Sequence, residues 1–146
     1  MTQLTEHFSL EELTHSDTAL AQGIDNTPPA VALGSLVEVA AGLERIRTKL
    51  GVPIRVTSGY RCPKLNDAIH GVHHSAHEEG YAADFTAAGF GNPKEIVQTL
   101  AESGLEFDQL IQEGTWVHVS FAPTMRKQVL TAHFALGKPT TYTLGA

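Results

Sequence analysis

The chain has 146 residues, of which 42% are hydrophobic and 18% are charged, and its formal net charge is −6. This length suits a single compact domain over residues 1–146, and the composition is that of a globular protein rather than of a disordered chain. The negative charge disfavours a nucleic-acid partner, because such binding depends on Lys and Arg side chains that neutralise phosphates.

The sequence contains no apolar segment of the kind that enters membranes. No run reaches the roughly eighteen apolar residues of a transmembrane helix. The first residues, MTQLTEHFSLEEL, lack the basic start and apolar core of a secretory signal. The single cysteine, Cys62, excludes an intrachain disulfide. We therefore expect a cytoplasmic protein without a membrane partner.

Helical patterns dominate the first third of the chain. Ser9 and Glu12 have the spacing of a capping box, which predicts a short helix to about residue 14. Residues 15–27 contain turn formers and no sustained period, and we expect a surface loop there.

A long amphipathic helix is predicted from Thr27 to Gly51. Pro28 and Pro29 suit its first turn, where amide donors have no partner within the helix. Apolar residues then recur at helical spacing, and the glycine ends the helix. Its expected apolar face consists of Leu33, Leu36, Val37, Ala40, Leu43, Ile46 and Leu50.

The remaining residues predict short strands separated by helices. Strands are expected at 54–57, 81–86, 107–113, 116–121 and 127–135, from their β-branched residues and alternation. Helices are expected from Pro63 to Ile69, with Leu65, Ala68 and Ile69 inward, and from Asn92 to Gly104, with Ile96, Val97, Leu100 and Ala101 inward. The tail from Gly137 is expected to be poorly anchored. We predict an α+β fold: a small antiparallel sheet with helices on one side.

The geometry of one predicted hairpin places a carboxylate near a histidine. Gly114 and Thr115 form a two-residue link that is typical of a type II′ turn. Glu113 then faces Trp116 across the strands, and His118 shares that face because it lies two residues further on. We expect Glu113 and His118 as diagonal neighbours, roughly 7 Å apart at Cβ, on the face away from the core.

This arrangement suits a zinc site with an open position. A histidine such as His118 ligates zinc, whereas Glu113 is placed to take a proton from an activated water. Alternation puts Asp84 on the polar face of its strand, and Gly80 lets His77 turn towards it. Two histidines and one carboxylate leave a vacant coordination position, which is typical of catalytic zinc.

The residues alone leave other interpretations open. The cluster of His70, His73, His74 and His77 also suits a solvated loop or adventitious metal binding. The HExxH motif of other zinc enzymes is absent, because Tyr81 stands where its second histidine would be. Asp84 also suits a turn cap. Spacing by itself leaves a metal site and a metal-free domain about equally open.

Three motifs carry a resemblance to a known family. They are SGYR at residues 58–61, SAHEEGYAAD at 75–84 and WVHVS at 116–120. The chain thereby resembles the zinc peptidases that include D-Ala-D-Ala carboxypeptidases, vancomycin-resistance dipeptidases and phage endolysins. FSLEELTHSDTA and GIDNTPP, near the N-terminus, resemble the small phage and prophage branch. The resemblance covers nearly the whole chain and implies a hedgehog/DD-peptidase-like fold.

The resemblance also implies roles for individual residues. His77, Asp84 and His118 match the zinc ligands. Arg61 matches an arginine that holds a substrate carboxylate or peptide carbonyl, a task that suits its fork of donors. Ser75 matches a small polar residue near the site.

The catalytic base is less directly matched. Several relatives carry the catalytic glutamate three residues before the last histidine ligand, where this chain has Thr115. Glu113 is nevertheless the best candidate, because the hairpin directs it towards the ligands; Asp108 and Glu106 are weaker substitutes. Trp116 is expected either as an apolar wall of the substrate groove or as packing of the hairpin.

The predicted function is zinc-dependent hydrolysis of a peptide bond in peptidoglycan stem peptides, by a D,D-carboxypeptidase or an endopeptidase. The alternative is a non-catalytic, zinc-containing module of the same fold that binds the cell wall or belongs to a phage particle. The presence of both Glu113 and Arg61 favours the enzyme. The expected partner is the peptidoglycan peptide, reached after release at host lysis or from a phage particle.

Overall fold

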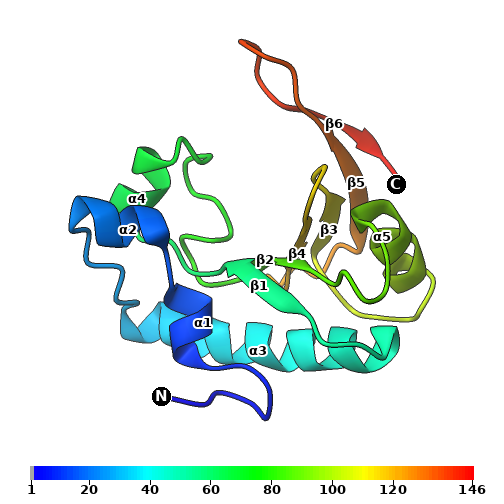
Figure 1. Ribbon diagram of the computed structural model, residues 1–146, viewed down its shortest axis with the longest axis horizontal. Coiled ribbons are helices and arrows are strands. Elements are labelled where there is room, and N and C mark those ends of the chain that lie inside the picture. The colour runs from blue at the N-terminus through cyan, green and yellow to red at the C-terminus, as the bar shows by residue number, and fades with distance from the viewer. Residues whose placement is uncertain (1) are drawn as a thin grey trace.

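The computed structural model describes residues 2–146, which form five helices and one six-stranded sheet (Figure 1). The helices are α1 (Leu10–Thr14), α2 (Asp17–Gln22), α3 (Ala30–Leu50), α4 (Pro63–Ala68) and α5 (Pro93–Ala101). The strands are β1 (Arg55–Ser58), β2 (Ala82–Thr86), β3 (Gln109–Gln112), β4 (Val117–Ser120), β5 (Gln128–His133) and β6 (Thr141–Leu144). The predicted α+β fold class is confirmed.

The strands lie in the order β1-β2-β4-β3-β5-β6. All neighbouring pairs are antiparallel except β3 and β5, which run parallel. The chain leaves β4 and crosses the start of β3, where Lys127 N–H donates to the carbonyl of Phe107 at 3.0 Å. Strand β5 therefore begins at the same end of the sheet as β3 and runs in the same direction. The sheet is therefore mixed where an entirely antiparallel one was expected.

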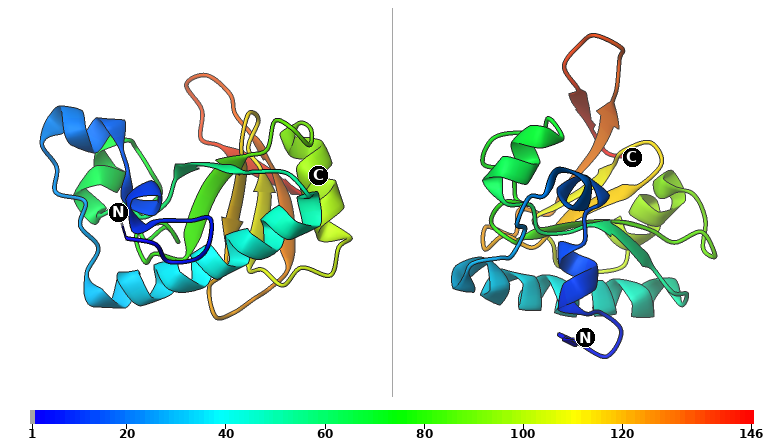
Figure 2. Two further views of the ribbon diagram at one scale, coloured as in Figure 1. Left: turned by 60° about the horizontal axis from the view of Figure 1, so that its bottom comes forward. Right: turned by 60° about the vertical axis from the view of Figure 1, so that its left-hand side comes forward.

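One face of the sheet packs against α3, which runs along it in Figure 2, and the core lies between them. The buried apolar residues of α3 are Ala32, Leu36, Val39, Ala40, Leu43, Ile46 and Leu50. The predicted stripe was wrong at two positions: Val37 is exposed and Leu33 is only partly buried. The true stripe passes through Val39 instead, and it includes Gly42, against which the ring of Phe121 packs.

The N-terminal prediction needs two corrections. The segment expected as a loop contains α2, which is capped by the Ser16 hydroxyl and ends at Gly23 with φ +65°. At six residues it is too short to show a helical period. The capping box of α1 is confirmed. The long helix begins at Ala30 with Pro29 as its N-cap, so the prolines precede its first turn.

Later elements also differ in detail. Ile69 and Ala101 are exposed, although both were expected to face inward, and α5 ends before the predicted stop at Gly104. The tail is anchored, because β6 pairs with β5 and Gln98 Nε2 donates to the Ala146 carbonyl at 3.0 Å. No helix within residues 2–146 has both the length and the apolar character needed to cross a membrane.

The turn that leads into β5 is held by the buried carboxylate of Asp108. Its Oδ1 accepts hydrogen bonds from Thr124 Oγ1 at 2.7 Å, from Arg126 N at 3.0 Å and from Arg126 Nε at 2.9 Å. Its Oδ2 accepts from Arg126 Nη2 at 2.8 Å. The Arg126 guanidinium, helped by Thr124, holds the pKa of Asp108 well below its ordinary value.

The substitution Asp108→Asn should lower the free energy of unfolding by roughly 2 kcal/mol at pH 7, because it removes a charge from this hydrogen-bonded group. A carboxyl whose pKa is depressed by folding stabilises the protein above its unfolded pKa of about 3.9 and loses that contribution as pH falls. The difference between wild type and variant, measured by urea unfolding, should therefore shrink below about pH 4. Asp67→Asn, at an exposed side chain, is the control. A difference that is constant from pH 7 to pH 3 would contradict this account.

Candidate metal centre

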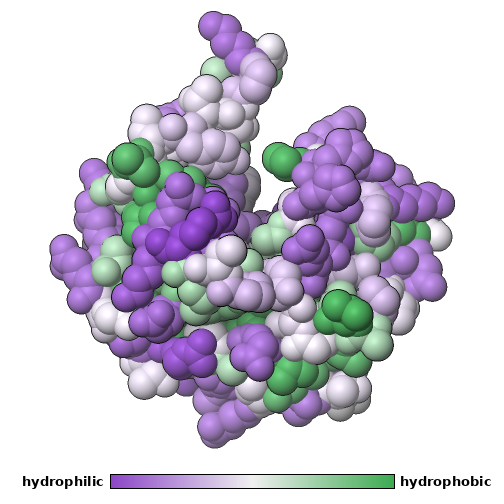
Figure 3. All heavy atoms as spheres, turned by 180° about the vertical axis from the view of Figure 1, so that it is seen from behind, coloured by the Kyte–Doolittle hydropathy of each residue, from purple (hydrophilic) through white to green (hydrophobic). Residues whose placement is uncertain are grey.

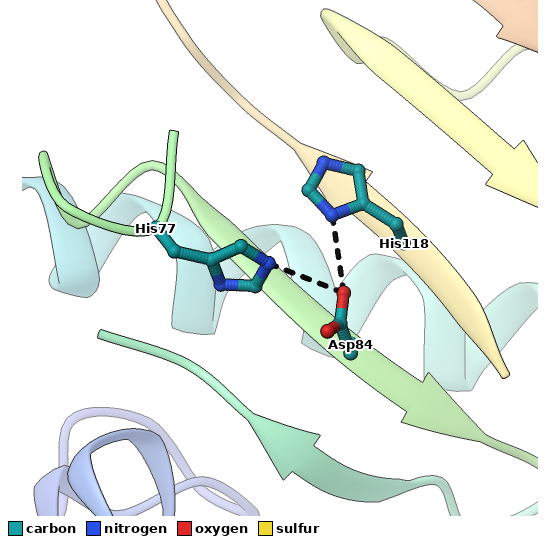
Figure 4. Close-up of side chains that lie close together, drawn as sticks. All are labelled: His77, Asp84 and His118. Atoms are coloured by element: carbon teal, nitrogen blue, oxygen red, sulfur yellow. Dashed lines mark hydrogen bonds and ion pairs between the residues drawn. The ribbon is translucent and has the colours of Figure 1, made fainter. Parts of the chain in front are cut away.

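Two of the three predicted ligands lie on adjacent strands. The register of β2 and β4 pairs Asp84 directly with His118. Their neighbours Ala83 and Phe85 point into the core, so Asp84 and His118 project from the opposite face of the sheet. Both side chains are buried, and His118 Nδ1 lies 3.1 Å from Asp84 Oδ1 (Figure 4).

His77 reaches the same oxygen from the loop before β2. Its Nε2 lies 3.3 Å from Asp84 Oδ1, and Figure 4 shows both imidazole rings directed at that atom. The loop turns at Gly80, where φ is +77° and a Cβ would collide with the Ala32 carbonyl of α3. The glycine is therefore required both by the turn and by the close approach of α3.

The SGYR segment fixes the orientation of His77. Its ring Nδ1 donates to the carbonyl of Gly59 at 2.7 Å, which leaves Nε2 as the atom that faces Asp84. Gly59 lies against α1, where a Cβ would run into the backbone of Leu13. Tyr60 N–H donates to the Leu13 carbonyl at 2.7 Å and locks this contact.

Arg61 holds the other oxygen of the central carboxylate. Its Nη2 lies 3.2 Å from Asp84 Oδ2. Its Nε donates to Ser58 Oγ at 3.1 Å and its Nη1 to Asn66 Oδ1 at 3.3 Å. The structure thus places Arg61 beside a predicted ligand, with three of its five N–H donors used within the protein.

The protonation states suit metal binding. Burial lowers the pKa of His77, so its imidazole stays neutral. Burial by itself would raise the pKa of Asp84, but His118 and the other polar groups around the carboxylate outweigh burial and hold that pKa well below its ordinary value. A neutral imidazole and an ionised carboxylate are the forms that ligate metal ions.

The arrangement fits a bound cation for a further reason. The proton of neutral His77 is committed to Gly59, so two lone pairs face each other between His77 Nε2 and Asp84 Oδ1. A positive charge between them removes this repulsion. The ligand atoms of a tetrahedral zinc site lie roughly 3.3 Å apart, and the two measured separations are 3.1 and 3.3 Å. One ligand atom from each of the three residues lies within 4.8 Å of the others.

Glu113 lies at the edge of this cluster. Its Oε1 is 3.6 Å from His118 Nδ1, and its N–H donates to the Trp116 carbonyl at 3.0 Å across the hairpin. Gly114 has φ +81°, as the tight turn requires. Burial raises the pKa of Glu113, with His118 opposing it in part. A proton acceptor of raised pKa therefore stands beside the cluster.

The other acidic and histidine candidates lie elsewhere. Asp108 is bound by Arg126, and Glu106 lies exposed at 3.6 Å from Lys127 Nζ. The loop histidines His70, His73 and His74 are exposed and do not join the cluster. The thiol of Cys62 caps α4 by accepting from Leu65 N–H at 3.4 Å.

Two of the three predicted substrate-binding residues, Ser75 and Trp116, each carry a buried polar atom. Within residues 2–146, neither the Ser75 hydroxyl nor the Trp116 indole N–H has a hydrogen-bond partner. The ring of Trp116 also packs against Phe134, with the centroids 6.0 Å apart. Trp116 is thus part of the hairpin packing and still has a donor available.

Sequence reasoning missed the supporting role of Asn66, which is fully buried on α4. It accepts from Arg61 and donates through Nδ2 to the Val72 carbonyl at 2.8 Å and to Glu78 Oε2 at 3.1 Å. It therefore joins the arginine to the loop that carries His77. The available signal was a polar residue at an inward helical position next to Leu65.

A search of curated proteins found no match. The family model described as Peptidase M15 matches residues 6–120, which include the three clustered residues, Arg61 and Glu113. Peptidases of this family depend on a metal ion. Because the match spans most of the sequence, the chain belongs to the peptidase M15 family.

Proposed function

We propose that the protein is a zinc-dependent peptidase that hydrolyses a peptide bond in the stem peptides of peptidoglycan. The observation that carries this proposal is the buried cluster of His77, Asp84 and His118 with Glu113 beside it at 3.6 Å. A structural metal site has no use for an additional carboxylate of raised pKa, whereas hydrolysis requires a proton acceptor at this position.

The proposed roles follow from the contacts. His77, Asp84 and His118 would hold zinc, which when bound lowers the pKa of water and polarises a carbonyl. Glu113 takes the proton of the attacking water and passes it to the leaving amine. Its raised pKa suits both steps, because the group must accept and then release a proton near the working pH.

Arg61 has two roles in this proposal. Its ion pair with Asp84 fixes the carboxylate between the two imidazoles. Two of its five N–H donors remain for a carboxylate or carbonyl of the substrate. A substrate with a free C-terminal carboxylate would make fuller use of them, which favours a carboxypeptidase over an endopeptidase.

Digestion of purified peptidoglycan tests this function directly. Mass spectrometry of the muropeptides should show products with the zinc-loaded protein, none after chelation, and recovery when zinc is restored. Loss of one alanine from the pentapeptide stem identifies a carboxypeptidase, whereas cleaved cross-links or internal bonds identify an endopeptidase. Absent products, or products that persist under chelation, would contradict the proposal and leave a binding module.

The substitution Glu113→Gln should lower turnover about 10²–10⁴-fold, because it removes a proton acceptor but no ligand. Zinc content per chain, measured by plasma mass spectrometry, should be unchanged. Glu106→Gln is the matched control, since that carboxylate is exposed and pairs with Lys127. Full turnover in Glu113→Gln would exclude it as the base, and loss of zinc would reassign it as a ligand.

A further inference from the structure

The sheet face that carries the ligand cluster continues into the β5–β6 hairpin. Ile111 pairs with His118 on one side and with Leu130 on the other, and Leu130 pairs with Leu144. Paired residues share a face of the sheet. Leu130 of β5 and Leu144 of β6 therefore lie on the same face as His118.

On the same face, a second row of side chains runs across neighbouring strands from Glu113 through Ala132 to Tyr142. Gln112 pairs with Thr131, so Glu113 is level with Ala132, and Ala132 pairs with Tyr142. Strands lie about 4.8 Å apart, which puts the backbones of Glu113 and Tyr142 roughly 10 Å apart. Only the methyl group of Ala132 stands between their long side chains.

Two observations support contact across this methyl group. Ala132 is only 6% exposed, although most of the hairpin is open to solvent, so longer side chains must cover it. Burial raises the pKa of Tyr142, and the negative charge of Glu113 adds to that effect. The phenol therefore stays protonated near neutral pH and is a hydrogen-bond donor.

The hairpin has one apolar and one polar face. Its polar face consists of Thr131, His133, Thr141 and Thr143. The apolar residues lie on the metal side, yet nothing covers most of them: Phe134 is 55% exposed, Tyr142 47% and Leu144 84%. Exposed apolar surface of this kind, continuous with a catalytic cluster, is typical of a binding site.

The hairpin stands at one side of an open hollow. In Figure 1 it projects from the sheet opposite α2 and α4, with β2 and β4 between them. Figure 3, seen from behind, shows the surface hollowed between the projecting hairpin and the lobe that contains α2 and α4. The family match ends at residue 120, so the hairpin lies outside the matched residues.

We propose that the β5–β6 hairpin forms one wall of the substrate cleft, and that the Tyr142 hydroxyl donates a hydrogen bond to the backbone of the bound stem peptide. This inference rests on the proposed function. Tyr142 lies two strands beyond Glu113 along this row and on the other side of the cluster from Arg61, so Tyr142 and Arg61 contact different parts of the bound peptide. Phe134 and Trp116, whose rings lie 6.0 Å apart, extend the wall.

The substitution Tyr142→Phe tests this proposal, because it keeps the ring and removes the donor. The kcat/KM for stem-peptide hydrolysis should fall about threefold to tenfold, the value of one hydrogen bond. Zinc content and thermal stability should not change. Tyr81→Phe is the matched control: Tyr81 precedes β2, on the face opposite Asp84, and its loss of a hydroxyl should have no effect.

A binding measurement separates this inference from the hydrolytic function. The zinc-loaded Glu113→Gln protein should bind an intact synthetic stem peptide without cleaving it. Adding Tyr142→Phe to this protein should weaken its affinity for the peptide about threefold to tenfold, as measured by calorimetry. If wild type cleaves but Tyr142→Phe matches Tyr81→Phe in both assays, the inference fails and the function stands. If wild type cleaves nothing but peptide binding depends on Tyr142, the hairpin wall stands and hydrolysis fails. If the peptide is neither cleaved nor bound, both are overturned.

Discussion

The buried charge of Asp84 is the constraint on which the rest of the structure depends. An ionised carboxylate removed from water costs several kcal/mol unless it is paired and hydrogen-bonded. Arg61 satisfies one of its oxygens, and His77 and His118 face the other. Neutral His77 donates its ring proton to the Gly59 carbonyl, so its Nε2 faces Asp84 Oδ1 with a lone pair. This contact is favourable only with a cation between the two atoms. The site is therefore organised for a metal ion by its hydrogen bonds as well as by its ligands.

The fold delivers these groups from segments far apart in the chain. The register of β2 and β4 sets Asp84 opposite His118, while α1 holds Gly59 and α3 holds Gly80 through contacts that leave no room for a Cβ. Since α3 covers one face of the sheet, the other face is left free for chemistry. Strands β2 and β4, which carry Asp84 and His118, lie between the lobe of α2 and α4 and the β5–β6 hairpin (Figure 1).

Local chemistry predicted much of this structure. The capping boxes of α1 and α5, the end of α3 at Gly51 and the diagonal placement of Glu113 and His118 follow from spacings within a few residues. The parallel pairing of β3 with β5 could not be predicted in this way, because its register depends on a crossover. Without that register, Tyr142 had no visible relation to Glu113. The short α2 and β6 were missed because four to six residues carry too little periodicity.

X-ray absorption at the zinc edge, on protein loaded with one equivalent of zinc, tests this ligand set most directly. Zinc held by His77, Asp84 and His118 should show a single environment of two imidazole nitrogens at about 2.0–2.1 Å, one carboxylate oxygen and solvent. The number of imidazoles should fall when His118 is replaced by alanine. A spectrum with three or more imidazoles that is unchanged by that replacement would place the ion on the exposed loop histidines. That result, or the absence of a bound ion, would contradict the central claim.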